Sequence, residues 1–111
     1  MKVVSSPKRG DVFLVELDPT RGSKIRKTRP CLVISPDELN QHLRTAILAP
    51  MTTGGHPYPF RIACRFAGKH GHVVLDQLRT VDRDRLRKRL GALTPAALGA
   101  VLTVLGEMFE I

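Results

Sequence analysis

Two short apolar runs, residues 12–17 and 31–34, flank a long basic segment, and this arrangement limits how the chain can fold. Both runs have the composition of strands, whereas residues 18–30 between them are too long for a tight hairpin turn. This segment carries five basic residues and, after Asp18, no acidic one. Long loops on compact domains are usually functional or disordered. The sequence predicts two strands joined by a cationic loop, and a solvated basic loop without a ligand is the alternative.

Arg29 stands directly before Pro30, and a residue before proline is biased towards extended backbone. We therefore expect Arg29 at the mouth of the second strand, held by the sheet beneath the basic loop. A guanidinium fixed in this way can bind a phosphate through two parallel hydrogen bonds.

Three further runs have strand composition, and the alternation of apolar and polar residues is clearest in the one that begins at Phe60. These predicted strands lie at residues 45–50, 60–66 and 72–78. Turn residues cluster at 54–57 and 67–71, and residues 35–40 are expected to hold a short helical turn.

Two helices are also predicted. Asp82 is a candidate N-cap for a short helix over residues 83–89. Thr94 and Pro95 are typical of the N-cap and first position of a longer helix over residues 95–109. Its apolar stripe, which we assign to the core or to a dimer contact, consists of Leu98, Val101, Leu102, Leu105 and Phe109.

Short antiparallel strands followed by one terminal helix predict an α+β fold, mostly antiparallel β, with a small and strongly bent sheet or barrel. The 111 residues are expected to form a single domain, residues 1–111. The net charge of +8 suggests a polyanion or an acidic protein as partner. No apolar run is long enough for a membrane, and the N-terminus has no secretory apolar region, so we expect a cytoplasmic protein.

The cysteines and histidines do not suggest a metal site. Cys31 and Cys64 have the surroundings of small buried apolar residues, and a disulfide is not expected in a reducing cytoplasm. The histidines make no ligand spacing with the cysteines; His70-Gly-His72 could bind a metal weakly, but ordinary loop histidines are the favoured interpretation. We expect a protein without metal or other cofactor.

Several motifs, taken in order and with their spacing, resemble the MazF/PemK family, the toxins of bacterial toxin–antitoxin pairs. The resemblance runs from about Arg9 to the C-terminal helix. Its motifs are GDVFLVELDPTRG at residues 10–22, KTRPCLVISP at residues 27–36, Ala49-Pro-Met-Thr-Thr53, Tyr58-Pro-Phe60 and Val74-Leu-Asp-Gln-Leu-Arg-Thr-Val-Asp82.

This resemblance implies an SH3-like barrel of the MazF/PemK/CcdB type with a C-terminal helix, forming a homodimer. It also implies an endoribonuclease that cuts single-stranded RNA, chiefly mRNA, at short sequences without a metal or the ribosome, and so inhibits growth. The implied partner is a cognate antitoxin with an acidic, flexible tail, and operator DNA is expected to be bound only together with that antitoxin.

Metal-independent RNA cleavage proceeds by attack of the ribose 2′-OH on the adjacent phosphate, which needs a base, an acid and fixed donors for the developing charge. In the family, the arginine matching Arg29 is catalytic and the threonine matching Thr52 lies at the phosphate. Asp76 matches an aspartate with an acid–base role in some relatives. A turn-capping role for Thr52 and an ion pair of Asp76 with Arg79 are the structural alternatives.

The resemblance also suggests residues that bind RNA; Gln77 suits base edges because its amide both donates and accepts. These candidates are Arg21, Arg26, Lys27, Thr53, Tyr58, Phe60, Gln77 and Arg79.

The chain departs from the family at Lys24, where many relatives carry a proposed catalytic glutamate. A protonated lysine is a poor base at neutral pH, so Lys24 is a candidate acid or phosphate ligand, or it marks an attenuated enzyme. Some relatives also have a histidine at the position of Ser23 and an arginine at that of Val74. The general base is thus left open.

Two other classes compete with the nuclease. A non-catalytic nucleic-acid-binding module would use the same basic surface, and Lys24 favours it. A CcdB-like toxin, which shares the fold, would poison DNA gyrase instead. The motifs around Arg29 and Thr52 favour the nuclease over both.

Overall fold

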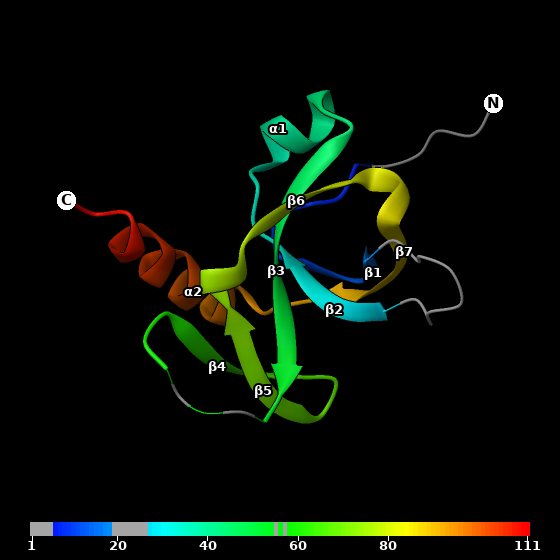
Figure 1. The fold of residues 1–111 in the computed structure, drawn as a ribbon. Coiled ribbons are helices and arrows are strands. Elements are labelled where there is room, and N and C mark those ends of the chain that lie inside the picture. Colours follow the sequence, from blue (N-terminus) through cyan, green and yellow to red (C-terminus); the bar gives the residue numbers. More distant parts are fainter. Residues whose placement is uncertain (1–5, 19–26, 55, 57) are drawn as a thin grey trace.

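The computed structural model describes residues 6–18, 27–54, 56 and 58–111, in which seven strands, two α-helices and two 3₁₀ turns follow one another (Figure 1). The strands are β1 (Asp11–Asp18), β2 (Lys27–Val33), β3 (Thr45–Thr53), β4 (Arg61–Phe66), β5 (Lys69–Val74), β6 (Arg79–Asp82) and β7 (Leu86–Ala92). The helices are α1 (Asp37–His42) and α2 (Pro95–Met108), and the turns are η1 (Leu75–Gln77) and η2 (Arg83–Arg85). The predicted α+β class with a C-terminal helix is confirmed.

All strand pairings in the described residues are antiparallel, in the order β4-β5-β3-β2-β1-β7, and β6 pairs with β3 outside this path. The long strand β3 pairs with β6 through its first half and with β5 at its end, so it joins two differently directed parts of the sheet (Figure 1). The outer strands β4 and β7 come close to each other through the Phe66 side chain of β4, which lies over Gly91 of β7. A Cβ on Gly91 would lie 3.2 Å from Phe66 Cζ. The sheet is therefore bent into a barrel-like shape.

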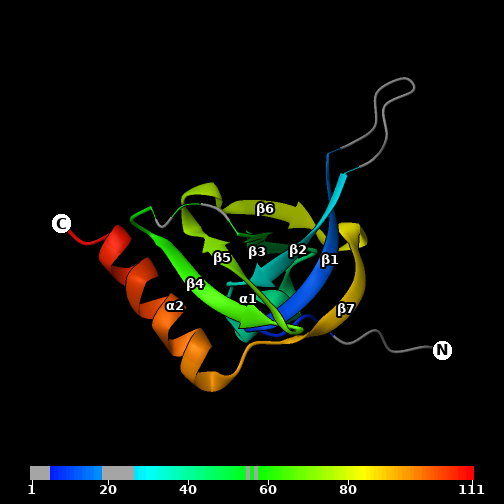
Figure 2. The same ribbon diagram turned by 90° about the horizontal axis from the view of Figure 1, so that it is seen from below.

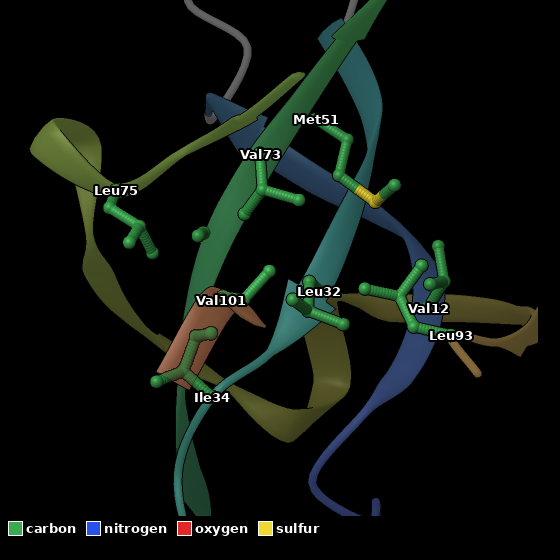
Figure 3. Close-up of a cluster of buried hydrophobic side chains, with 9 residues drawn as sticks. Val12, Leu32, Ile34, Met51, Val73, Leu75, Leu93 and Val101 are labelled. Atoms are coloured by element: carbon green, nitrogen blue, oxygen red, sulfur yellow. The ribbon is translucent and has the colours of Figure 1, made fainter. Parts of the chain in front are cut away.

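Helix α2 covers one face of this sheet beside β4 (Figure 2). It begins as predicted, with Thr94 accepting a hydrogen bond from the Ala97 N–H at 3.2 Å and Pro95 at its first turn. Val101 is fully buried against the strands, whereas Phe109 at the end of the predicted stripe is exposed. The cluster under α2 (Figure 3) consists of Val12, Leu32, Ile34, Ala49, Met51, Val73, Leu75, Leu93 and Val101.

A second, smaller cluster is formed by the alternate residues of the same strands: Val15, Leu17, Cys31, Leu48 and Val81. Neighbouring residues of a strand point to opposite faces. Leu32 belongs to the cluster under α2 while Cys31 belongs to the second one. Arg29 lies two residues from Cys31 in β2, and Thr52 lies four residues from Leu48 in β3. Because side chains alternate between faces, Arg29 and Thr52 lie on the same face as Cys31 and Leu48, opposite α2.

The predicted helix over residues 83–89 is wrong. Asp82 does act as a cap, because its carboxylate accepts a hydrogen bond from the Asp84 N–H at 2.9 Å, but only the short turn η2 follows. The chain then enters β7, where Arg87 and Arg89 form ion pairs with Glu16 and Asp11 of β1. Pairing with β1 outweighs the local helical pattern of this charged segment.

The predicted strand over residues 72–78 is only partly right. Strand β5 begins earlier, at Lys69, and ends at Val74, where η1 takes over. The predicted turn at 67–71 shrinks to Ala67 and Gly68, whose positive φ values of 52° and 76° suit a two-residue hairpin. The other predicted strands are present with shifted ends, and α1 lies slightly later than the predicted turn at 35–40. The turn predicted at 54–57 includes residues 55 and 57, which lie outside the described part.

Candidate active site

A row of polar residues crosses the face opposite α2. Strands β2 and β3 pair Cys31 with Pro50, and Arg29 and Thr52, which lie two residues beyond this pair on each strand, line the same two hollows. Thr52 in turn pairs with His72 of β5. Residues directly opposite each other on antiparallel strands share a face, with Cβ atoms about 4.5–5.5 Å apart. The sheet thus brings Arg29, Thr52 and His72 into one row.

Beside this row lies a hollow of about 660 Å³, called here the basic hollow. It is lined by Leu17, Arg29, Pro50, Thr52, Arg61, Val74, Gln77, Leu78, Arg79 and Thr80. Three guanidinium groups and no carboxylate stand among these described lining residues. Such a set of donors can bind a phosphate and neutralise negative charge that develops on it.

Arg29 and Thr52 also line a second hollow of about 670 Å³ on their other side. It is lined by Thr28, Arg29, Pro30, Met51, Thr52, Thr53, Cys64, Phe66, Ala67, Lys69, His70, Gly71 and Leu90. Arg29 and Thr52 therefore lie between two concave surfaces. This position suits groups that act on one phosphate within a longer phosphate-containing chain.

The arginines of the basic hollow are fixed to different degrees. Arg79 donates a hydrogen bond to the Leu17 carbonyl oxygen at 3.0 Å. Arg61 makes two hydrogen bonds to the Asp76 carboxylate, at 2.9 and 3.0 Å, and its guanidinium carbon lies 4.9 Å from the centre of the Tyr58 ring. Within the described residues Arg29 makes no side-chain hydrogen bond, so its donors are available to a ligand.

Asp76 is therefore paired with Arg61 and not with Arg79, the partner considered from the sequence. The hydrogen bond from Arg61 lowers the pKa of Asp76, and the same bond raises the pKa of Arg61. Both groups stay charged at neutral pH. Asp76 does not line the basic hollow, so its geometry suits holding Arg61 better than exchanging protons with a substrate.

Cys31 lies beneath the row and is not a nucleophile. Burial raises the pKa of its thiol to about 12, and the nearby charges of Arg79 and Arg29 offset this only in part. Its Sγ donates a weak hydrogen bond to the Arg29 carbonyl oxygen at 3.6 Å. Cys31 therefore remains a protonated core residue, as the sequence predicted.

Gly71 of β5 allows this strand to pack closely against the backbone of Thr52 in β3. A Cβ at this position would lie 1.7 Å from the Thr52 carbonyl oxygen, far inside van der Waals contact. The obstacle is backbone, which cannot swing aside as a flexible side chain does. Glycine at position 71 therefore fixes how closely β5 packs against the part of β3 that carries Thr52.

The structure distributes the other sequence-predicted residues over several places. Gln77 and Arg79 line the basic hollow, and Thr53 lines the second hollow. Tyr58 and Phe60 are exposed just before β4. Lys24, Arg21 and Arg26 lie outside the described residues, as does the side chain of Lys27.

Two residues of the site, Arg61 and His72, were not among the sequence-predicted candidates. The alternation in residues 60–66 did assign Arg61 to the polar face of its strand, which was the available signal. For His72 the signal was weaker, because the register that sets it opposite Thr52 depends on strands far apart in sequence.

The described residues contain no group of three or more His, Cys, Asp or Glu side chains placed to hold a metal ion. None of their helices is both long and apolar enough to span a membrane.

The fold and the site define a class: small, antiparallel, barrel-like proteins with an arginine-rich hollow suited to phosphate. Within that class, the sequence profile of the family described as "PemK-like, MazF-like toxin of type II toxin-antitoxin system" matches residues 8–109. The chain belongs to this family, as the sequence motifs predicted.

Individual relatives agree with this assignment. The chain is 35% identical over 104 residues to Endoribonuclease PemK of Escherichia coli, which covers 88% of this chain and 78% of that protein. It is 31% identical over 93 residues to Endoribonuclease toxin MazF of Escherichia coli (strain K12), covering 83% and 84% of the two chains. A solved structure of a mycobacterial endoribonuclease in complex with its cognate antitoxin superposes with a TM-score of 0.77 at 27% identity, covering 92% and 93%.

Proposed function

We propose that this chain is the toxin of a type II toxin–antitoxin system and that it cuts single-stranded RNA, chiefly mRNA, at specific short sequences without a metal. The family assignment supports the toxin role, and the relatives named as endoribonucleases support the reaction class. The observation that carries the proposal is the pair Arg29 and Thr52, which line both hollows and stand beside two further arginines.

In the proposed reaction the ribose 2′-oxygen attacks the adjacent phosphorus and the bond to the 5′-oxygen breaks. The products are a 2′,3′-cyclic phosphate and a 5′-OH. Arg29 stabilises the charge of the phosphorane, and the Thr52 hydroxyl donates to the same phosphate. Asp76 contributes by holding Arg61 at the hollow, because its lowered pKa makes it a weak base.

The remaining arginines and the polar residues extend the RNA-binding surface. Arg79 and Gln77 lie in the basic hollow, next to Arg29. Thr53 lies in the second hollow, and Tyr58 and Phe60 offer exposed aromatic rings on which bases can stack. Arg21, Arg26 and Lys27 add positive charge from the segment before Arg29, and Lys24 serves as an acid or a phosphate ligand.

The partners we propose are a second copy of this chain and a cognate acidic antitoxin, with operator DNA bound only in the company of the antitoxin. A solved relative in complex with its cognate antitoxin supports the second partner. The net charge of +8 suits an acidic segment. Exposed apolar side chains that a dimer could cover are Leu39, Leu43, Leu90 and Phe109.

Incubation of the purified protein with a long single-stranded RNA in EDTA tests the proposal against its two rivals. Discrete fragments that end in 2′,3′-cyclic phosphate and 5′-OH support the nuclease. Retention of intact RNA supports the non-catalytic binding module. Intact, unretained RNA together with inhibition of DNA gyrase supports the CcdB-like toxin. Cleavage that EDTA abolishes contradicts the metal-independent mechanism.

A further inference from the structure

His72 occupies the third place in the polar row. It lies in β5 directly opposite Thr52, and on its other side it pairs with Ala63 of β4. Its side chain is half-buried. The small Ala63 leaves space above the sheet on that side, so the imidazole is held between strands without being covered by a large neighbour.

The tautomer of His72 follows from its hydrogen bond. Its Nδ1 lies 2.8 Å from the Gly54 carbonyl oxygen. A carbonyl oxygen only accepts, so Nδ1 must carry the hydrogen. In the neutral ring this leaves Nε2 with a free lone pair, the form in which histidine accepts a proton. The backbone carbonyl of Gly54, directly after β3, thus orients His72 as a base.

His72 also borders the concave surface of the site. It lines a third hollow of about 310 Å³ with Gly54, Ala63, Cys64, His70 and Gly71. Cys64, His70 and Gly71 line the second hollow as well, which contains Arg29 and Thr52. The second and third hollows therefore share three lining residues, and His72 lines the third one.

Apart from the neighbouring His70, the other described groups near the row are poor proton acceptors at neutral pH. Arginine stays protonated, Asp76 is tied to Arg61, and the Cys31 thiol has a pKa of about 12. The charged or titratable side chains that the described parts of β2, β4, β5 and β6 place on the same face as His72 are Arg29, Arg61, Arg65, His70 and Arg79. None of them is a carboxylate.

We propose that His72 is the general base of this enzyme, an inference that rests on the proposed nuclease function. Nε2 takes the proton of the 2′-OH as the 2′-oxygen forms its bond to phosphorus. The bond between phosphorus and the 5′-oxygen breaks, the 5′-oxygen takes a proton from water, and the imidazolium later releases its own proton to water. His72 would in this way supply the proton acceptor that a lysine at position 24 does not.

The substitution His72→Asn tests this directly, because the asparagine amide can keep the hydrogen bond to the Gly54 carbonyl oxygen while it lacks Nε2. Loss of a general base lowers the rate by about 100- to 10,000-fold. We expect a loss of this size in the saturating cleavage rate, and affinity for a 2′-deoxy RNA analogue within a few-fold of wild type. Any dependence of the wild-type rate on pH that arises from this base should also vanish.

Matched variants show whether a loss of rate comes from misfolding or from replacing any histidine of the chain. His42→Asn, at the end of α1, should leave the rate and its pH profile unchanged. Unfolding measured by circular dichroism checks each variant, and His72→Gln, assayed in the same way, replaces His72→Asn if the latter does not fold.

Two results would overturn the inference while the proposed function stands: a His72→Asn enzyme with the wild-type rate and pH profile, or a loss confined to His70→Asn. A wild-type protein that cuts no RNA would overturn the proposed function and this inference together.

Discussion

At the scale of single residues, the site depends on where strands β2 and β3 position Arg29 and Thr52. Pro30 keeps Arg29 extended, and Arg29 lines the same two hollows as Thr52. Arg79 and Arg61 are held by the Leu17 carbonyl and the Asp76 carboxylate, while Arg29 has no such restraint among the described residues. The least restrained arginine is thus the one assigned to the reacting phosphate.

Replacing Arg29 should affect chemistry more than binding. We expect Arg29→Ala to lower the cleavage rate by about 100- to 1,000-fold, the usual cost of losing one preorganised donor to transition-state charge. RNA affinity should weaken less, because Arg61 and Arg79 remain. Single-turnover cleavage and RNA binding, measured on the same preparation, separate the two effects; an Arg29→Ala protein that cuts at the wild-type rate would remove Arg29 from the mechanism.

Lys24 offers a second residue-scale test. If a carboxylate at this position takes part in proton transfer, Lys24→Glu should raise the cleavage rate at saturating RNA. Because the substitution changes the formal charge by two units, more RNA should be needed to reach saturation, and the saturating rate isolates the chemical effect. An unchanged or lower saturating rate would make position 24 peripheral and leave His72 as the base.

The ion pair between Asp76 and Arg61 limits which groups can control how the cleavage rate depends on pH. The hydrogen bond from Arg61 lowers the pKa of Asp76 below its ordinary value. For a lowered pKa, the stabilisation is present above the unfolded-state pKa and is lost as the pH falls through the folded-state value. The pair therefore stays intact from about pH 5 to 8, and a change in rate over that range must come from another group.

At the scale of elements, the close packing of β5 on β3 holds Thr52 and His72 together. A Cβ on Gly71 would meet the Thr52 carbonyl oxygen, so Gly71→Ala should push the strands apart. We expect a loss of about 1–3 kcal/mol in the free energy of unfolding, as for other overpacked sites, and a lower cleavage rate.

Gly99 provides the matched control for this prediction. It lies within α2, and a Cβ there would have no neighbouring atom within 4 Å. Gly99→Ala should stabilise the protein by up to about 1 kcal/mol, because alanine is the better helix former. Chemical denaturation of both variants gives the comparison, and a Gly71→Ala protein as stable as wild type would contradict the close approach.

Local patterns were enough to predict some elements and not others. The alternation over residues 60–66 and the Thr94–Pro95 start of α2 are decided by neighbours in sequence, so they could be predicted. Residues 83–89 were misassigned because their strand state depends on β1, with which Leu86 and Arg89 pair across the sheet. A charged segment of this kind carries little local information about such distant pairing.

Some residues of the candidate site could likewise be predicted from the sequence, and others could not. Arg29 and Thr52 were found because their motifs resemble those of a family, and the structure brings them to the same hollows. The partner of Asp76 could not be predicted, because Asp76 lies in the turn η1 after β5 while Arg61 lies in β4, and only the β4–β5 pairing brings them together. His72 was missed for the same reason.

At the scale of the whole molecule, the charge and the exposed apolar residues determine the partners. The net charge of +8 should make association with an acidic antitoxin segment weaken as salt rises, because screening reduces interactions between exposed charges. Titration of an acidic peptide at increasing ionic strength measures this. An affinity independent of salt would contradict the electrostatic part of the proposal, and light scattering that finds a monomer at micromolar concentration would contradict the dimer.

In the proposed mechanism the RNA itself supplies the nucleophile, while the row of Arg29, Thr52 and His72 assists its attack. A pair of oligonucleotides that contain a cleaved sequence, identical except for a single 2′-deoxy substitution at the nucleotide whose 2′-oxygen would attack, tests this directly. We expect the all-RNA strand to be cut in EDTA to a 2′,3′-cyclic phosphate, whereas the substituted strand should bind with similar affinity and stay intact. Cleavage of the substituted strand at the same position would contradict it.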